Sequence, residues 1–166
     1  MASVEDYARR GREERLARLA RTPDELASAI AGRSDPALSR RPDARNWAAK
    51  EVLCHLRDNE EWFFARLELI LAMNEPPLPR NDPDRWADER QYLRHDGAAA
   101  LAAFRRRRED TLALLNGLAP NDWARAGLHL DSRGRRTIDE FVSVMAWHDD
   151  NHLDQLRRAL SSEGAA

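Results

Sequence analysis

The segment that follows Thr137 places apolar residues and two histidines at the spacing of one helix face. Its predicted inward-facing residues are Phe141, Val144, Met145, His148, His152 and Leu156. Positions three and four apart lie on the same side of an α-helix, so this pattern predicts a helix with one buried face. Thr137 is suited to cap its N-terminus, with Asp139 in the first turn. A stripe of this kind must pack against other elements.

The composition favours helices throughout the 166 residues. Ala, Leu, Arg and Glu dominate, and all four are good helix formers. Val, Ile and Thr are scarce, which argues against any substantial sheet. The length suits one domain that buries about 68–70% of its unfolded surface. We therefore expect an all-α protein whose residues 1–166 form a single domain.

Four long helical patterns are present along the chain. They run from about Val4 to Ile30, from Trp47 to Asn74, from Asp96 to Asn116, and onward from Thr137. The first is expected to break at Thr22-Pro23, with Thr22 as an N-cap and Pro23 as the first helical residue. Asp96 should cap the third helix and Gly117 should end it. Four such helices predict a four-helix bundle, in which metal sites form between facing helices.

The segment from Glu75 to Asp96 contains four prolines, at positions 76, 77, 79 and 83. Proline interrupts helices, so no regular element is expected through its first half, although Trp86 to Leu93 could form a short helix. A connection this long inside a compact domain is more often functional than idle. We expect it to cover the candidate site, with Trp86 as the covering side chain.

Three histidines form the main candidate site. His148 and His152 are four residues apart, and two imidazoles at that spacing can bind one metal ion at about 2.0–2.1 Å. His55 lies on the inner face of the second predicted helix, and as a third ligand it would leave one coordination position open. The pair could also be a half-buried polar patch, and His55 alone could be a hydrogen-bonded core residue.

Two motifs carry a family resemblance. The run Trp47-Ala48-Ala49-Lys50-Glu51-Val52-Leu53-Cys54-His55-Leu56-Arg57-Asp58 resembles the second-helix motif of the DinB/YfiT-like superfamily. The run His148-Asp149-Asp150-Asn151-His152-Leu153-Asp154-Gln155 resembles its His-x-x-x-His-x-x-Gln signature. The segment from Asp122 to Thr137 is similar to the one that leads into the last helix of that superfamily.

The resemblance implies a four-helix bundle with an unusual helix order, a homodimer, and a divalent metal, zinc or nickel, on His55, His148 and His152. It also implies chemistry on a small-molecule substrate, because characterised relatives include transferases and isomerases that use a low-molecular-weight thiol. A metal with an open position lowers the pKa of a coordinated water or thiol, so hydrolysis is equally compatible. Ala48 departs from the usual Ser of the motif, which leaves Asn46 as the expected helix cap.

Other polar residues are candidates for supporting roles. Glu51, Asp58, Asp149 and Gln155 lie within a turn of a predicted ligand and could accept a hydrogen bond from its second nitrogen. A solvent-facing position is the stronger expectation for Asp149. Glu51 and His129 are the candidate catalytic residues, although His129 could equally be a surface histidine.

Two further features favour structural roles. Cys54, the only cysteine, is expected to be a small buried apolar residue, and His95 a helix-start residue. The run from Arg105 to Arg108 covers a whole helical turn and is expected to be a solvated face paired with carboxylates.

Charge and hydropathy exclude several classes of partner. The net charge of −2 gives no support to nucleic-acid binding. No apolar stretch is long enough to cross a membrane, and the charged first 21 residues do not resemble a signal peptide, so we expect a cytoplasmic protein.

The sequence thus favours a metal-dependent enzyme, either a thiol-dependent S-transferase or isomerase or a small hydrolase. The alternatives are a non-catalytic metal-binding stress-response or small-molecule-binding module, and a plain bundle with structural histidines.

Overall fold

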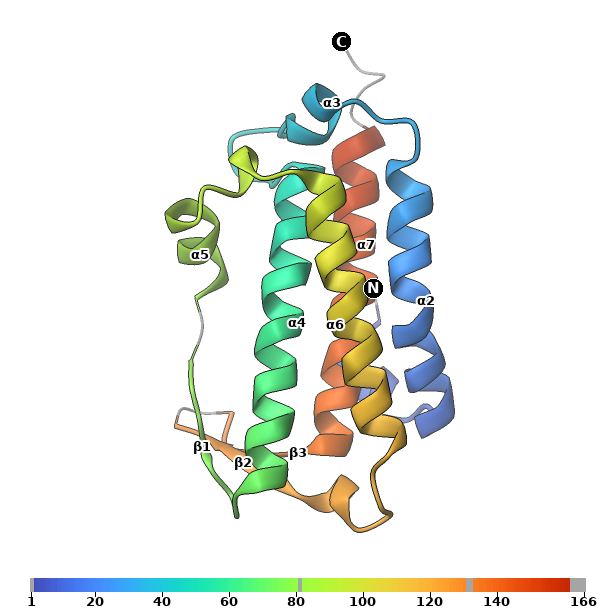
Figure 1. The fold of residues 1–166 in the computed structure, drawn as a ribbon, viewed down its shortest axis with the longest axis vertical. Coiled ribbons are helices and arrows are strands. Elements are labelled where there is room, and N and C mark those ends of the chain that lie inside the picture. The colour runs from blue at the N-terminus through green and yellow to red at the C-terminus, as the bar shows by residue number, and fades with distance from the viewer. Residues whose placement is uncertain (1, 81, 131–132, 162–166) are drawn as a thin grey trace.

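The computed structural model describes residues 2–80, 82–130 and 133–161. Its body is a bundle of four long helices, which are α2 (Arg12–Ile30), α4 (Ala49–Ala72), α6 (Gly97–Asn116) and α7 (Ile138–Ser161). Two short helices, α1 (Val4–Ala8) and α3 (Asp35–Ser39), precede α2 and α4. Figure 1 shows α2 and α7 running upward and α4 and α6 running downward. The predicted all-α four-helix bundle is confirmed.

The order of the helices around the bundle differs from their order in the chain. Helix α4 packs against α6 and α7, and α2 packs against the same two helices. Helices α2 and α4 therefore lie diagonally opposite each other, as do α6 and α7. Two of the three connections between successive long helices cross a diagonal, which agrees with the unusual order implied by the resemblance.

The direction of α4 and α6 explains why the segment between them is long. Because both helices run downward, the chain must return along the outside of the bundle before α6 can begin (Figure 1). This crossover contains strand β1 (Pro77–Leu78), helix α5 (Pro83–Glu89) and the 3₁₀ turn η1 (Tyr92–Arg94). The expected short helix is thus present, but α5 begins earlier than Trp86, because Asp82 accepts a hydrogen bond from the backbone N–H of Arg85 (3.1 Å) and caps it.

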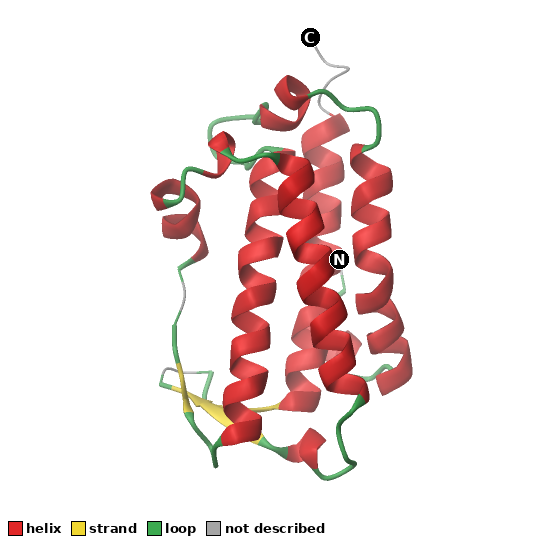
Figure 2. Cartoon of the chain, viewed as in Figure 1, coloured by secondary structure: helices red, strands yellow, loops and turns green. Residues whose placement is uncertain are grey.

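A small three-stranded sheet closes the lower end of the bundle (Figure 2). After the 3₁₀ turn η2 (Asp122–Ala124), strand β2 (Ala126–His129) pairs in parallel with β1 and antiparallel with β3 (Arg135–Thr137). A Cβ atom at Gly127 would lie 2.6 Å from Cδ2 of Leu78, so only glycine lets β2 approach β1 this closely.

The expected helix break at Thr22-Pro23 is wrong. Helix α2 continues through Pro23, and the chain instead breaks between α1 and α2, where Gly11 is the N-cap residue. Proline has no N–H for the carbonyl four residues earlier, which is that of Leu19. Nη1 of Arg108 on α6 donates to this oxygen at 3.0 Å. A tertiary hydrogen bond thus replaces the one that the helix lacks.

The other predicted helix ends are mostly confirmed. Asp96 accepts the N–H of Ala99 at 2.7 Å and caps α6, and Gly117 ends it. Thr137 and Glu140 form a reciprocal capping box at the start of α7. Asn46 is not the cap of α4. Ala48 takes that position, and its N–H donates to the carboxylate of Glu51 at 2.9 Å.

The bundle core consists of two apolar clusters with a layer of polar side chains between them. The upper cluster includes Leu26, Leu56 and Phe104, and the lower cluster includes Leu19, Phe63 and Leu115. Buried polar residues from all four long helices occupy the intervening level, namely Thr22, Glu60, Arg108, Thr111 and Asp149. Among the described residues, no helix is long and apolar enough to span a membrane.

Candidate metal centre

The three predicted histidines converge between α4 and α7. His55 lies on α4, and His148 and His152 lie one turn apart on α7. One ring nitrogen from each lies within 4.8 Å of the other two. Nε2 of His55 is 3.0 Å from Nε2 of His148, although 93 residues separate them in the chain. The fold therefore brings together the set that the sequence identified.

The spacing of these nitrogens suits one cation. Two nitrogens bound at 2.0–2.1 Å to the same metal lie about 2.9–3.4 Å apart, depending on the bond angle. The His55–His148 separation falls in that range. The ring centroids of His55 and His148 lie 4.3 and 4.2 Å, respectively, from that of His152. The three rings therefore form one compact cluster.

Burial keeps the imidazoles in the neutral form that can bind a metal. Desolvation, reinforced by the neighbouring His152, lowers the pKa of His55 to about 3. Desolvation also lowers the pKa of His148 well below its usual value, and the two other imidazoles and Arg108 add to the effect. The pKa of His152 is lowered by burial, against the opposing influence of Gln155 and Asp149.

One of the four predicted supporting residues contacts a ligand. Oε1 of Gln155 lies 2.7 Å from Nδ1 of His152, so the amide can fix the ring with Nε2 facing the other imidazoles. Nδ1 of His55 is buried and has no hydrogen-bond partner among the described residues. The alternative of His55 as a hydrogen-bonded core residue therefore rests only on its contact with His148.

The other three supporting candidates serve the scaffold. Glu51 caps α4 and forms an ion pair with Arg41. Asp58 accepts hydrogen bonds from Arg57 at 2.6 Å and from Tyr92 at 2.8 Å. Neither contact involves a histidine ligand, so these carboxylates hold the start of α4 and the crossover in place.

Asp149 is not solvent-facing as expected. It is 1% exposed and lies in the polar layer with Arg108, whose Nη1 is 2.5 Å from Oδ2 of Asp149. Arg108 is also 1% exposed and binds both carboxylate oxygens of Glu60, at 2.9 and 2.8 Å. The expectation of a fully solvated Arg105–Arg108 face is thus wrong at position 108. His148 faces the cleft while its neighbour Asp149 faces the core.

Asn59 is a site residue that sequence reasoning missed. Its side-chain amide lies 2.6 Å from Nε2 of His148, the same nitrogen that faces His55. Asn59 stands one turn after His55 on α4, and that spacing is the signal that could have identified it. Since the two ends of an amide differ only in their hydrogen-bonding role, Asn59 could offer either an N–H or a carbonyl oxygen at this point.

The imidazoles open onto a cleft of about 390 Å³. Aromatic side chains form much of its wall, including Trp47, Phe63, Phe141 and Trp147. His129 also lines it, from strand β2, so this candidate catalytic residue is a cleft residue and is only 6% exposed. Glu51, the other candidate, lies outside the lining.

The crossover borders the cleft through a different residue than expected. Pro83 and Asp84, at the start of α5, are part of the lining. Trp86 instead packs edge-on against Trp62, with ring centroids 5.4 Å apart. The crossover thus forms one rim of the cleft, but Trp86 does not cover the imidazoles.

Cys54 and His95 were both expected to have structural roles. Cys54 is fully buried, and desolvation raises its pKa to about 11, so it is a core residue as predicted. His95 precedes the cap of α6 and also contacts Arg57, at 3.1 Å.

Comparison with known proteins assigns the family. The model of the DinB superfamily matches residues 18–156. The relative named "Putative metal-dependent hydrolase YfiT", from Bacillus subtilis (strain 168), is 23% identical over 81% of this chain and 76% of its own length. "Putative metal-dependent hydrolase OB0413", from Oceanobacillus iheyensis, is 21% identical over 85% of this chain and 80% of its own.

The fold comparison agrees with this family. The solved structure of Bacillus subtilis YfiT, described as an unusual four-helix bundle topology, aligns with a TM-score of 0.85 at 21% identity. The alignment covers 99% of this chain and 91% of that one. Because the family model spans most of its length, this chain belongs to the DinB superfamily.

Proposed function

We propose that this protein is a metal-dependent enzyme that acts on a small molecule, with His55, His148 and His152 as ligands of a divalent cation. The observation that carries the proposal is the meeting of three neutral imidazoles from two helices at the base of an open cleft. The names of the relatives, which describe metal-dependent hydrolases, support it. Imidazole suits zinc and nickel equally well, and these are the cations that we propose.

The residues around the ligands have distinct proposed roles. Gln155 orients His152, and the Asn59 amide, 2.6 Å from His148, is placed to hydrogen-bond a reacting group at the site. A bound divalent cation would polarise a substrate oxygen or stabilise the anionic form of a coordinated group. The aromatic wall of the cleft excludes water from one side of that position.

Hydrolysis is the reaction that the relatives' names favour. It requires a group that accepts a proton from water, and His129 is the cleft residue suited to that role. Its ring packs against Phe141, with centroids 5.9 Å apart, and this contact holds it in place.

Thiol transfer to a small electrophile is the second candidate reaction. Among the described lining residues, the only carboxylate is that of Asp84, which is exposed at the rim. A low-molecular-weight thiol as co-substrate needs no carboxylate base, because a cation lowers the pKa of a coordinated thiol directly. The scarcity of carboxylates among the described lining residues is the specific observation that favours this reaction.

Metal content tests the ligand assignment. We expect about one divalent cation per chain in the purified protein and much less in each of the variants His55→Ala, His148→Ala and His152→Ala. His95→Ala is the matched control, since it removes a histidine outside the cleft. Full metal content in all three ligand variants would refute the assignment.

Turnover tests the enzymatic proposal separately. The metal-loaded protein should hydrolyse members of a panel of small esters and amides, or should join a thiol to a small electrophile, and either activity should disappear in His152→Ala. A metal-loaded protein that is inactive throughout both panels would contradict the proposal and favour a non-catalytic binding module.

The homodimer implied by the family is also a proposal. Light scattering coupled to size-exclusion chromatography should give twice the chain mass of 19.0 kDa. A mass of 19.0 kDa across micromolar concentrations would contradict it.

A further inference from the structure

We propose that Arg108 is a positioning residue for the metal centre, because it holds α4 and α7 at the separation and rotation that bring His55 and His148 together. This inference rests on the proposed function for the role of the cation. The contact between the two rings can be measured without a cation.

One guanidinium joins the two helices that carry the histidines. Arg108 extends from α6 and donates to both carboxylate oxygens of Glu60 on α4, at 2.9 and 2.8 Å. It also donates to both carboxylate oxygens of Asp149 on α7, at 2.5 and 3.1 Å. We call these three side chains the Arg108 bridge. Paired contacts from a planar guanidinium fix orientation as well as distance, so the bridge restrains both sliding and turning of α4 against α7.

The bridge lies close to the ligands along both helices. Asp149 directly follows His148, and successive side chains on a helix point about 100° apart. The rotation of α7 that directs Asp149 to Arg108 therefore also directs His148 to the cleft. Glu60 follows His55 by five residues, which places it about 7.5 Å further along α4 on a face about 140° away. The same guanidinium thus sets the rotation of both helices near their histidines.

Burial strengthens this restraint. Arg108, Glu60 and Asp149 are each 1% exposed, so water does not compete for their contacts and their charges interact strongly. Each carboxylate is held by a second helix as well. Thr22 of α2 donates to Asp149 at 2.5 Å, and Thr111 of α6 donates to Glu60 at 2.7 Å. All four long helices therefore meet at the bridge.

The rings themselves have weaker restraints than the helices. Nδ1 of His55 has no hydrogen-bond partner among the described residues, and its ring packs against Trp47 with centroids 5.0 Å apart. Gln155 orients only His152. The distance between His55 and His148 therefore depends on how α4 is placed against α7.

A positioning role gives a reason for burying these charges. A buried ion cluster is costly to desolvate, and apolar side chains of similar volume can often replace it without loss of stability. Apolar packing would fill the same space, but it would not fix the rotation of two helices as a paired set of hydrogen bonds does.

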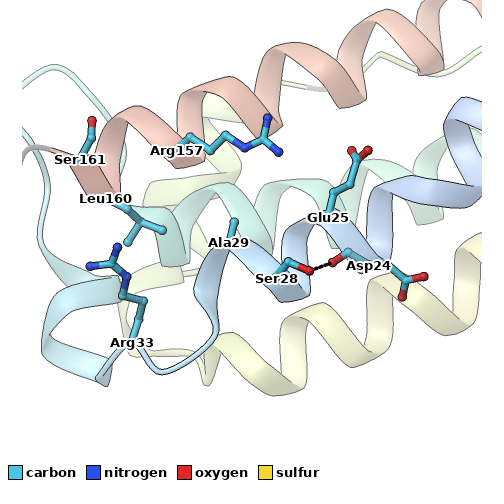
Figure 3. A pocket seen from close by; sticks show the side chains of 8 residues that line it. All are labelled: Asp24, Glu25, Ser28, Ala29, Arg33, Arg157, Leu160 and Ser161. Atoms are coloured by element: carbon cyan, nitrogen blue, oxygen red, sulfur yellow. Dashed lines mark hydrogen bonds between the residues drawn. The ribbon is translucent and has the colours of Figure 1, made fainter.

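Arg157 provides a matched control on the helix of His148 and His152. It is exposed and lines a hollow of about 490 Å³ between the upper ends of α2 and α7 (Figure 3). The polar layer does not include it. Arg157→Met removes an arginine from a ligand-bearing helix without touching the bridge, so the metal centre should be unaffected.

A triple variant separates positioning from stability. Arg108→Met combined with Glu60→Gln and Asp149→Asn leaves no unpaired charge in the polar layer, but it no longer joins α4 to α7. We expect its affinity for Zn²⁺, measured by chelator competition on folded protein, to fall about tenfold or more, as for residues that orient metal ligands. Leu26→Ala, at a buried position of α2, is the control for lost stability. It should lower the urea midpoint and keep the wild-type affinity.

Arg108→Lys is the second variant. It keeps one positive charge but lacks the planar fork that reaches both carboxylates. Its affinity for Zn²⁺ should also fall, by less than in the triple variant, and it provides the test if the triple variant does not fold.

The ring contact gives a second readout that needs no cation. The ring centroids of His55 and His148 lie 5.1 Å apart, close enough for a nuclear Overhauser effect between their ring protons. We expect this effect in metal-free wild-type protein, in Arg157→Met and in Leu26→Ala. It should be weaker or absent when the bridge is removed.

Three outcomes decide the inference. Wild-type affinity together with an intact ring contact in the bridge variants would overturn it. An equal loss of affinity in Leu26→Ala would also overturn it, because lost stability alone would then explain the effect. Wild-type protein that binds no Zn²⁺, but whose ring contact depends on Arg108, would refute the metal assignment and support the positioning role.

Discussion

Replacing Arg108 by Met should destabilise the protein more than any other single change of a charged residue outside the cleft. Methionine fills a similar length and keeps the apolar part of the side chain. It removes every hydrogen bond that Arg108 donates, which are those to Glu60, to Asp149 and to the Leu19 carbonyl. Two buried carboxylates and one helical carbonyl would lose their partner together.

The size of the effect follows from these contacts. Removing one partner of a buried ion pair costs about 3–5 kcal/mol, because the other charge stays buried without compensation. The Leu19 oxygen, for which Pro23 provides no N–H, adds roughly 1–3 kcal/mol. The hydroxyls of Thr111 and Thr22 still donate to the two carboxylates, at 2.7 and 2.5 Å, and limit the loss. We expect the free energy of unfolding to fall by about 4–6 kcal/mol, a large part of the typical total of about 5–15 kcal/mol.

Urea unfolding followed by circular dichroism at 222 nm measures this loss. With a typical urea dependence of about 2 kcal/mol per molar, the midpoint should fall by about 2–3 M. Arg106→Met is the matched control on the same helix, because position 106 is exposed, and its midpoint should stay near that of the wild type.

A triple variant tests the electrostatic reason. Adding Glu60→Gln and Asp149→Asn to Arg108→Met leaves no unpaired charge in the polar layer, so much of the lost stability should return. The reasoning would be refuted by a loss below about 1 kcal/mol in Arg108→Met, or by a triple variant that is no more stable than the single one.

Four further predictions concern the cleft and its surroundings. Neutral His55 should make metal-free protein less stable as the pH falls, because its pKa is about 6.5 in the unfolded chain and about 3 in the folded one. Its contribution to stability is complete above pH of about 6.5 and is lost progressively toward pH of about 3. A melting temperature that is constant from pH 7 to 5 would contradict this. Cys54, whose pKa burial raises to about 11, should react with an alkylating reagent at pH 8 only after unfolding, and rapid stoichiometric labelling of the native protein is the opposing result. Gly127→Ala should cost about 1–3 kcal/mol in urea unfolding, because its Cβ would overlap Leu78, and an unchanged midpoint would show that β1 moves aside freely. Asn59→Ala should weaken metal affinity about tenfold in chelator competition without abolishing it, and equal affinity would argue against a role for this amide at the site.

The local chemistry of the site could be predicted from the sequence. His148 and His152 share one helix face by spacing alone, and Gln155, three residues later, is within reach of the second ring. His55 was connected to them by its place on the inner face of the second predicted helix and by its motif. The helix ends at Asp96, Gly117 and Thr137 follow from short-range capping preferences, which act within a single turn.

Features that depend on tertiary contacts could not be predicted in this way. The continuity of α2 through Pro23 requires a donor from α6, and no property of the first 30 residues indicates it. The diagonal order of the helices and the parallel direction of α4 and α6 likewise depend on how the whole chain packs.

The polar layer was missed for a different reason. Leu101, Phe104 and Leu115 set the phase of α6, and at that phase positions 108 and 111 face the core. The neighbouring arginines concealed this, because a run of identical charges gives no indication of which member is buried. Asp149 was misassigned in the same way, since acidic residues also flank it at positions 150 and 154.

The three imidazoles become available at different stages of chain folding. His148 and His152 need only one turn of α7 to form a two-point chelate, and any transient helix in the unfolded chain presents them together. His55, 93 residues before His148, reaches that position only when α4 has docked against α7. A cation captured early by α7 would therefore bind more tightly once the bundle closes, so that metal uptake and the last step of folding reinforce each other.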